Sequence, residues 1–128
     1  MCEAITKGIS VKVKAKYQED VSQPHMASFF YSYKVTITNT SVQPVKLISR
    51  VWEIKDSIGE NIYVEGDGVV GLQPEILPGE SFQYESNVVL KTGLGEMFGT
   101  YTLINKISYE QFPVAIPVFK LVAPFCLN

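Results

Sequence analysis

The sequence has very little of the residues on which most catalytic and metal-binding chemistry depends. Among its 128 residues there are one histidine, one arginine, one tryptophan and two cysteines. A Ser-His-Asp triad or a transition-metal site would have to be built on His25, which lies in the turn-like stretch Ser22-Gln23-Pro24-His25. The chain also shows no nucleophile–base pair and no recognisable carboxylate dyad. We therefore predict that His25 is an exposed loop residue and that the protein is not an enzyme.

Paired cysteines, long apolar runs and a surplus of basic charge are also missing. Cys2 and Cys126 lie at opposite ends of the chain, and residues 1–7 contain no apolar segment of the kind found in a secretory signal. No apolar run approaches the roughly 20 residues of a membrane span. The net charge of −2 and the pI near 5.4 argue against a nucleic-acid binder. We expect a cytoplasmic protein with two free thiols, no membrane insertion and no nucleic-acid partner.

Alternation of apolar and polar residues with a period of two dominates what is present. Residues 9–17 and 29–37 alternate throughout, and the stretches 45–54, 61–64, 81–90, 97–104 and 107–121 follow between turn signals. No window of ten or more residues keeps a helical period. The pattern predicts an all-β fold: an immunoglobulin- or fibronectin type III-like antiparallel β-sandwich, in a single domain spanning residues 1–128. A small closed barrel is the alternative.

Two irregularities in this pattern carry information about the strands. The apolar parity slips between Leu47 and Ile48, which predicts a β-bulge. Pro113 and Pro117 interrupt the last run, which favours an edge strand or a kinked strand. Because the segment 112–121 carries few charges, we also predict that a second copy of the chain covers its apolar side chains in a homodimer.

The charges are unevenly distributed along the chain. Residues 1–50 carry a net charge of +4, residues 51–90 a net charge of −7, and residues 91–128 a net charge of +1. Strands from the first two segments can pair and neutralise each other across the surface, which is the interpretation we favour. The alternative is an acidic cluster that attracts a hard cation or a basic partner.

A glycine-rich loop connects two of the predicted strands. Gly66, Gly68 and Gly71 form the pattern G-x-G-x-x-G, but two prolines follow and no helix begins, so the context excludes a dinucleotide-binding fold. Two interpretations remain. The glycines permit positive φ in a tight loop, which we favour, or their amides form a nest for phosphate. Because Glu65 and Asp67 repel a bare phosphate, the second interpretation needs a Mg²⁺ ion that bridges carboxylate and phosphate oxygens.

Arg50 and Trp52 lie two residues apart and therefore on one face of a strand, unless the bulge intervenes. Trp52 is predicted to fill the core between the sheets, with Arg50 over an aromatic ring or a carboxylate near the edge. The functional alternative is a hot spot for a protein partner that includes Arg50, because both residue types are enriched at such sites.

The spacing of residues in and around the glycine loop resembles the bacterial ApaG family. The resemblance covers about residues 8–121 and is carried by these matches: Gly66-x-Gly68-Val69-Val70-Gly71-x-x-Pro74, Leu77-Pro78-Gly79-x-x-Phe82-x-Tyr84-x-Ser86, Tyr33-x-Val35-x-Ile37-x-Asn39, Ser49-Arg50-x-Trp52-x-Ile54-x-Asp56-x-x-Gly59, Met97-x-Gly99-x-Tyr101 and Phe112-x-Val114-x-Ile116-x-x-Phe119. Val51 stands where the family often has histidine. A proton-transfer or metal role at that position is therefore not available in this protein.

The resemblance implies a fibronectin type III-like β-sandwich that acts as a binding module, with no enzymatic activity attached to it. It also implies an association with cobalt resistance and magnesium efflux, and a pyrophosphate-type site at Gly66, Gly68 and Gly71. We therefore expect a non-enzymatic module that binds an unidentified protein partner, contributes to Co²⁺/Mg²⁺ homeostasis and has no cofactor of its own. The alternative is binding of phosphate, pyrophosphate or a nucleotide through residues 66–71, with Mg²⁺ as a bridging ion. A third hypothesis is direct metal binding by the acidic segment, with Glu65 and Asp67 as candidate ligands.

Overall fold

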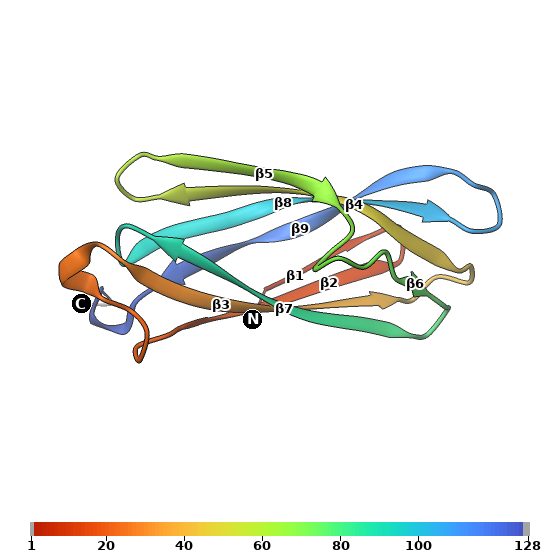
Figure 1. Cartoon of the computed structure of the whole chain (residues 1–128). Helices are drawn as coiled ribbons and strands as arrows, with labels where there is room; N and C mark the ends of the chain where they lie inside the picture. Colours follow the sequence, from red (N-terminus) through yellow and green to blue (C-terminus); the bar gives the residue numbers. More distant parts are fainter. Residues whose placement is uncertain (1, 127–128) are drawn as a thin grey trace.

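The computed structural model describes residues 2–126 as two antiparallel β-sheets packed face to face (Figure 1). The first sheet contains, in spatial order, β1 (Cys2–Thr6), β2 (Ile9–Tyr17), β3 (Phe29–Asn39) and β7 (Ser81–Leu90). The second sheet contains β5 (Asn61–Asp67), β4 (Val45–Asp56), β8 (Leu94–Asn105) and β9 (Gln111–Val122), and the short β6 (Glu75–Ile76) also pairs with β4. The predicted β-sandwich is confirmed, and the closed-barrel alternative is wrong.

The helical segments of the described chain are two three-residue 3₁₀ turns, η1 (Pro24–Met26) and η2 (Pro124–Cys126). Neither they nor any other part of residues 2–126 form a helix that is long and apolar enough to cross a membrane. His25 lies in η1 and is exposed, as predicted.

The core lies between the two sheets and consists of the inward-facing side chains of strands in which apolar and polar residues alternate. In β3, every odd-numbered residue from Phe29 to Asn39 is buried, whereas the even-numbered residues are half-buried or exposed. Trp52 of β4 is buried, with its ring tilted or edge-on against Tyr33, Tyr101 and Phe119 at centroid distances of 5.5–6.3 Å. Aromatic pairs favour such arrangements over flat stacking. The predicted core role of Trp52 is confirmed.

Both irregularities in the sequence pattern appear in the second sheet. The register between β4 and β8 shifts between Leu47 and Ser49, where the bulge was predicted. β9 is an edge strand that carries Pro113 and Pro117, so neither proline interrupts a ladder on both sides.

The predicted homodimer loses part of its basis in β9. The apolar side chains expected to meet a second copy are buried in this chain's own core; they are Phe112, Val114, Ile116, Phe119 and Leu121. A dimer at this strand would have to use the outward-facing Pro113, Ala115 and Val118 instead. The homodimer stays a prediction.

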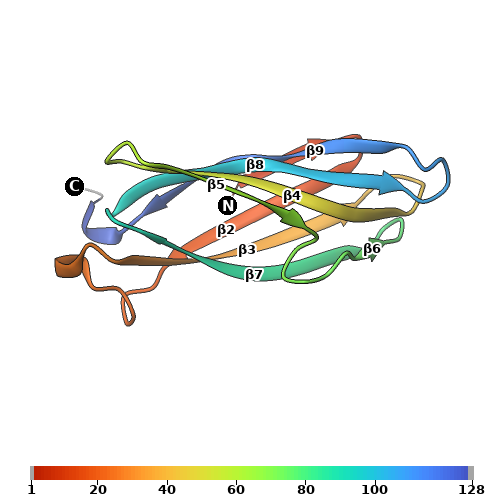
Figure 2. The same ribbon diagram turned by 45° about the horizontal axis from the view of Figure 1, so that its top comes forward.

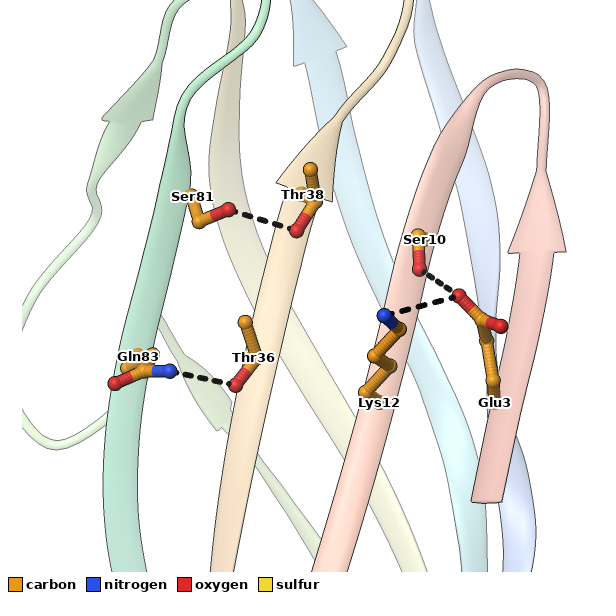
Figure 3. A network of polar contacts seen from close by, with 7 residues as sticks. All are labelled: Glu3, Ser10, Lys12, Thr36, Thr38, Ser81 and Gln83. Carbon is orange, nitrogen blue, oxygen red and sulfur yellow. Dashed lines mark hydrogen bonds and ion pairs between the residues drawn. The ribbon is translucent and has the colours of Figure 1, made fainter. Parts of the chain in front are cut away.

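Polar side chains cover the outer face of the first sheet (Figure 3). Four contacts connect its strands: Ser10 Oγ donates to Glu3 (2.6 Å), Lys12 Nζ lies 3.9 Å from the same carboxylate, Gln83 donates to Thr36 (3.0 Å), and the Thr38 and Ser81 hydroxyls share a hydrogen bond (2.7 Å). Lys14, Lys16 and Lys34 are exposed on this face as well. The face therefore carries an excess of lysine over carboxylate.

The two sides of the sandwich differ in how they are closed. β1 and β2 lie against β9, and the Ala115 amide donates to Thr6 Oγ1 at 3.2 Å, which closes one side. The opposite side is bordered by β5 and β7, which belong to different sheets and each pair with a single neighbour on the sheet path (Figures 1 and 2). The glycine loop begins at the end of β5 on this second side and leads to β6.

Candidate functional site

The tip of the glycine loop is a two-residue turn with both central residues at positive φ. Val69 and Leu72 exchange backbone hydrogen bonds at 2.8 and 2.9 Å. Between them Val70 has φ +48° and Gly71 has φ +78°. This is the pattern of a type I′ turn, in which asparagine or aspartate followed by glycine is preferred. Gly71 therefore serves the conformation of the turn.

Close neighbours favour glycine at positions 66 and 68, and a positive φ favours it at position 68 as well. Gly68 has φ +62°, and a Cβ atom there would lie 2.2 Å from the Leu72 carbonyl oxygen. A Cβ atom at Gly66 would lie 2.9 Å from Nη1 of Arg50. Gly68 and Gly71 thus fit the interpretation that positive φ selects glycine, whereas Gly66 makes space for a side chain.

Most amides of this loop already have partners within the protein. The Gly68 amide donates to the Ile48 carbonyl at 2.8 Å, and the Val69 and Leu72 amides bond to each other's carbonyls. Within the described residues, Val70 and Gly71 at the tip are the two consecutive loop residues whose amides make no hydrogen bond. The loop therefore offers an anion two adjacent amides, and a nest formed by Gly66, Gly68 and Gly71 together is not assembled.

Arg50 reaches from β4 across the strand pair to the glycine loop. It is the register partner of Gly66, and its Nη1 atom donates to the carbonyls of Asp67 at 3.0 Å and Gly68 at 2.9 Å. The side chain is half-buried. The sequence favoured an aromatic ring or a carboxylate as the neighbour of Arg50. In the structure, its hydrogen-bond acceptors are backbone carbonyls. The role of Arg50 in partner binding stays a prediction.

Glu65 and Asp67, the predicted metal ligands, are both exposed on β5. They flank Gly66, so strand alternation puts them on the outer face of the sheet, opposite to the face of Arg50. Within residues 2–126, no three His, Cys, Asp or Glu side chains lie close enough together to hold a metal ion. Cys2 and Cys126 are half-buried, and no disulfide joins them in the structure.

A pocket of about 170 Å³ opens between the sheets on the side bordered by β5 and β7. Its walls come from both sheets and include Tyr33, Arg50, Trp52, Val64, Ser86 and Asn87. Sequence reasoning named Arg50 and Trp52 but did not place Tyr33 and Ser86 with them. The signal was present, because tyrosines at inward positions of two strands need partners for their hydroxyl groups.

Three tyrosine hydroxyls gather next to this pocket. Those of Tyr84 and Tyr101 form a hydrogen bond across the two sheets. Burial raises the pKa of Tyr33, Tyr84 and Tyr101 above the ordinary tyrosine value, because the phenolate form loses its hydration. The Arg50 guanidinium opposes this shift at all three tyrosines.

The raised tyrosine pKa values predict a loss of stability in alkali. Below about pH 9, these tyrosines are protonated in both states and the free energy of unfolding does not depend on them. Above about pH 10, the unfolded chain releases these protons first, so stability falls as pH rises. Guanidinium unfolding followed by Trp52 fluorescence should show this decline, and Tyr84→Phe should make it shallower. Constant stability through this range would contradict the assignment.

The two strand orders, with β1-β2-β3-β7 facing β5-β4-β8-β9, define the class of the fold as a fibronectin type III-like β-sandwich. Comparison with known proteins narrows the class to a family. A family model of the ApaG domain matches residues 19–105. A protein named Protein ApaG from Mesorhizobium japonicum is 45% identical over 124 residues, which cover 97% of this chain and 95% of the relative. A second, from Anaeromyxobacter dehalogenans, is 44% identical over 128 residues and covers all of both chains.

A solved structure agrees with these relatives. The crystal structure described as an ApaA protein from Bordetella pertussis has a TM-score of 0.88 to this chain at 39% identity, and the match covers 91% of this chain and 94% of that one. The chain belongs to the ApaG family. The resemblance noted in the sequence is therefore confirmed.

Proposed function

We propose that this protein is a non-enzymatic interaction module whose edge strand β5 accepts an extended segment of a partner protein. The observation that carries the proposal is the one-sided pairing of β5, which bonds to β4 and borders the open side of the sandwich. Six of its seven residues are exposed, including Ile62 (42%), Tyr63 (60%) and Val64 (36%). Unlike β9, β5 has no proline, and it has no lysine either, although these are common guards of edge strands.

The backbone of β5 has donors and acceptors that point away from the sheet. Asp56 donates its amide to the Glu60 carbonyl, and Gly68 donates its amide to the Ile48 carbonyl. Because antiparallel strands alternate, the even-numbered residues between them bond to β4, whereas Asn61, Tyr63 and Glu65 direct their N–H and C=O groups outward. An added strand would pair with these three residues.

The charge around β5 indicates a basic partner. Glu53 faces the same outer surface as Tyr63 and Glu65, and Asp67 follows at the end of the strand. Residues 51–90, which contain β5, carry a net charge of −7. A partner segment with lysine or arginine at alternate positions complements this edge. Its binding should therefore weaken as salt is added.

A proline at position 65 tests strand addition with little harm to the fold. It removes an outward-facing amide, which an edge strand tolerates, and Glu65→Ala removes the same side chain but keeps the amide. We expect proteins captured from a bacterial lysate by the wild type to be lost with Glu65→Pro and retained with Glu65→Ala, while circular dichroism shows both variants folded. Capture that is equal for both variants would contradict the proposal.

The association with cobalt and magnesium efflux is proposed to act through this partner. Support comes from the exposed edge of β5, which pairs with β4 alone. A strain that carries Glu65→Pro should then be as sensitive to cobalt as a strain that lacks the protein. Normal cobalt resistance in a strain whose Glu65→Pro protein is folded and abundant would show that cobalt resistance does not depend on the β5 edge.

Binding of phosphate or a nucleotide through residues 66–71, with Mg²⁺, is the weaker candidate. Most loop amides are already bonded, and the carboxylates of Glu65 and Asp67 stand on the outer face of β5. Isothermal titration with pyrophosphate and ATP, with and without Mg²⁺, distinguishes the two functions. Heat that requires Mg²⁺ and is abolished by Asp67→Asn would favour the nucleotide function.

A further inference from the structure

The pocket between the sheets is lined by one cationic side chain, that of Arg50, which forms no ion pair with a carboxylate of the described residues. Arg50 is the one charged residue among those that line the pocket, and it is half-buried. None of the ion pairs formed among residues 2–126 involves it. A guanidinium that is partly withdrawn from water is stabilised by hydrogen-bond acceptors and by negative charge. The two loop carbonyls supply acceptors, and the negative charge is missing.

The guanidinium group is held in place while most of its donors remain free. Nη1 donates to the carbonyls of Asp67 and Gly68, and the bare backbone of Gly66 lies beneath the group. An arginine has five N–H donors. The Nε–H and the two Nη2 hydrogens form no hydrogen bond within the described residues. Nε–H and one Nη2 hydrogen form the fork that matches two oxygens of a phosphate or a carboxylate.

We propose that this pocket binds a small oxyanion, a phosphate or carboxylate group, with the free fork of Arg50 as its main ligand. Tyr33 and Ser86 line the pocket from the first sheet and add neutral hydroxyl groups, and Val64 adds an apolar wall. Asn87 borders the pocket on β7, with its side chain on the outer face of that sheet. This site is different from an amide nest in the glycine loop, because its ligands are side chains on β3, β4 and β7. It is also independent of strand addition at β5.

The size of the pocket limits the ligand. Its volume of about 170 Å³ is below the roughly 300–1,000 Å³ of pockets that enclose drug-sized ligands. A single phosphate or carboxylate group fits such a space, whereas a nucleotide would leave most of its surface outside. The ligand is therefore a free small anion or the anionic end of a larger molecule.

The acidic side chains of β5 lie on the opposite face of the sheet from this pocket. Glu65 and Asp67 flank Gly66 in the strand, so their side chains project from the outer face of the sheet. The Arg50 side chain lies on the inner face. The carboxylates of Glu65 and Asp67 therefore lie on the solvent side of the sheet, where water and salt screen their repulsion of an anion in the pocket. The low polarity of Trp52 and Val64 further strengthens a charge-assisted bond there.

Nuclear magnetic resonance titrations with inorganic phosphate, acetate and phenyl phosphate test the site. We expect at least one of these anions to shift the signals of Arg50, Ser86 and Asn87 saturably. Binding of inorganic phosphate or acetate alone would identify the ligand as a free anion of that type. Tighter binding of phenyl phosphate would identify it as the anionic end of a larger molecule. Arg50→Gln should weaken the affinity by about tenfold or more, because it removes a charge-assisted fork. Lys34→Gln, which removes a cation from the outer face of the first sheet, should leave it unchanged.

Two further variants keep the result interpretable. Arg50→Gln also removes the hydrogen bonds that hold the glycine loop, so its effect on affinity has two possible causes. Ser86→Ala leaves that loop unchanged and should still weaken binding, to a smaller extent. Gly71→Ala changes the turn tip and should leave the affinity unchanged. The absence of saturable shifts would overturn the proposal. It would also be overturned by binding that survives Arg50→Gln or that depends on Gly71.

Discussion

Replacing Gly68 by alanine should lower the free energy of unfolding by about 3 kcal/mol or more. A residue with a Cβ atom pays roughly 1–2 kcal/mol for the left-handed conformation that Gly68 adopts at φ +62°. The added Cβ would also lie 2.2 Å from the Leu72 carbonyl oxygen, so the backbone must move. That movement disturbs the hydrogen bond from the Gly68 amide to the Ile48 carbonyl and the pair of hydrogen bonds between Val69 and Leu72. Denaturant unfolding followed by Trp52 fluorescence measures the loss.

Gly71→Ala is the matched control for this substitution. Gly71 has a similar φ of +78°, but no atom lies within 4 Å of its added Cβ. Its cost should therefore be limited to the conformational part, about 1–2 kcal/mol. Equal losses for the two variants would show that the contact with Leu72 is unimportant. A Gly68→Ala protein with the wild-type melting temperature but without pyrophosphate binding would show that the loop is an anion nest.

Asn39→Ala should destabilise the protein by about 3 kcal/mol or more, since four hydrogen bonds end on one fully buried side chain. Its Nδ2 atom donates to the carbonyls of Gln43 at 2.8 Å and Ile76 at 2.9 Å. Its Oδ1 atom accepts from the amide and the hydroxyl of Ser41 at 2.9 and 2.6 Å. The side chain thereby connects the β3–β4 turn to β6. Alanine leaves the buried Ile76 carbonyl without this donor.

Asn105→Ala provides the comparison with a half-exposed asparagine. Asn105 Oδ1 accepts from the amides of Ile107 at 2.8 Å and Ser108 at 3.1 Å, in an arrangement similar to that around Asn39. Water can replace these bonds, so the loss should be about 1 kcal/mol. Calorimetric melting temperatures of both variants test this difference. Similar melting temperatures for the two variants would contradict the importance of burial.

The strands could be predicted where their inward residues are apolar, and not elsewhere. β1 was missed because its inward residues are the small or polar Cys2, Ala4 and Thr6, whereas Ile5 faces outward. β6 has only two residues and has no detectable period. By contrast, the slip at Leu47 predicted the bulge, because a change of parity must accompany an extra residue in one strand.

The candidate site depended on contacts that side-chain types do not encode. The pairing of Arg50 with Gly66 follows from the register of β4 and β5, which the sequence predicted only as neighbouring strands. The acceptors of Arg50 are backbone carbonyls, which every residue has, so no pattern distinguishes Asp67 and Gly68 as its partners. The positive φ values of Gly68 and Gly71 were predictable, because few other residues adopt them at low cost.

The lysines on the outer face of the first sheet give the molecule an electric dipole that its small net charge conceals. Lys12, Lys14 and Lys16 stand on one outer surface of the sandwich, while Glu53 and Glu65 stand on the other. At low ionic strength, such a dipole favours the stacking of molecules with the basic face of one against the acidic face of the next. The screening length for charge–charge interactions is about 10 Å in 0.1 M salt, so we expect added salt to weaken this association. Purification in dilute buffer should therefore lower the solubility of a protein that is well behaved near physiological salt.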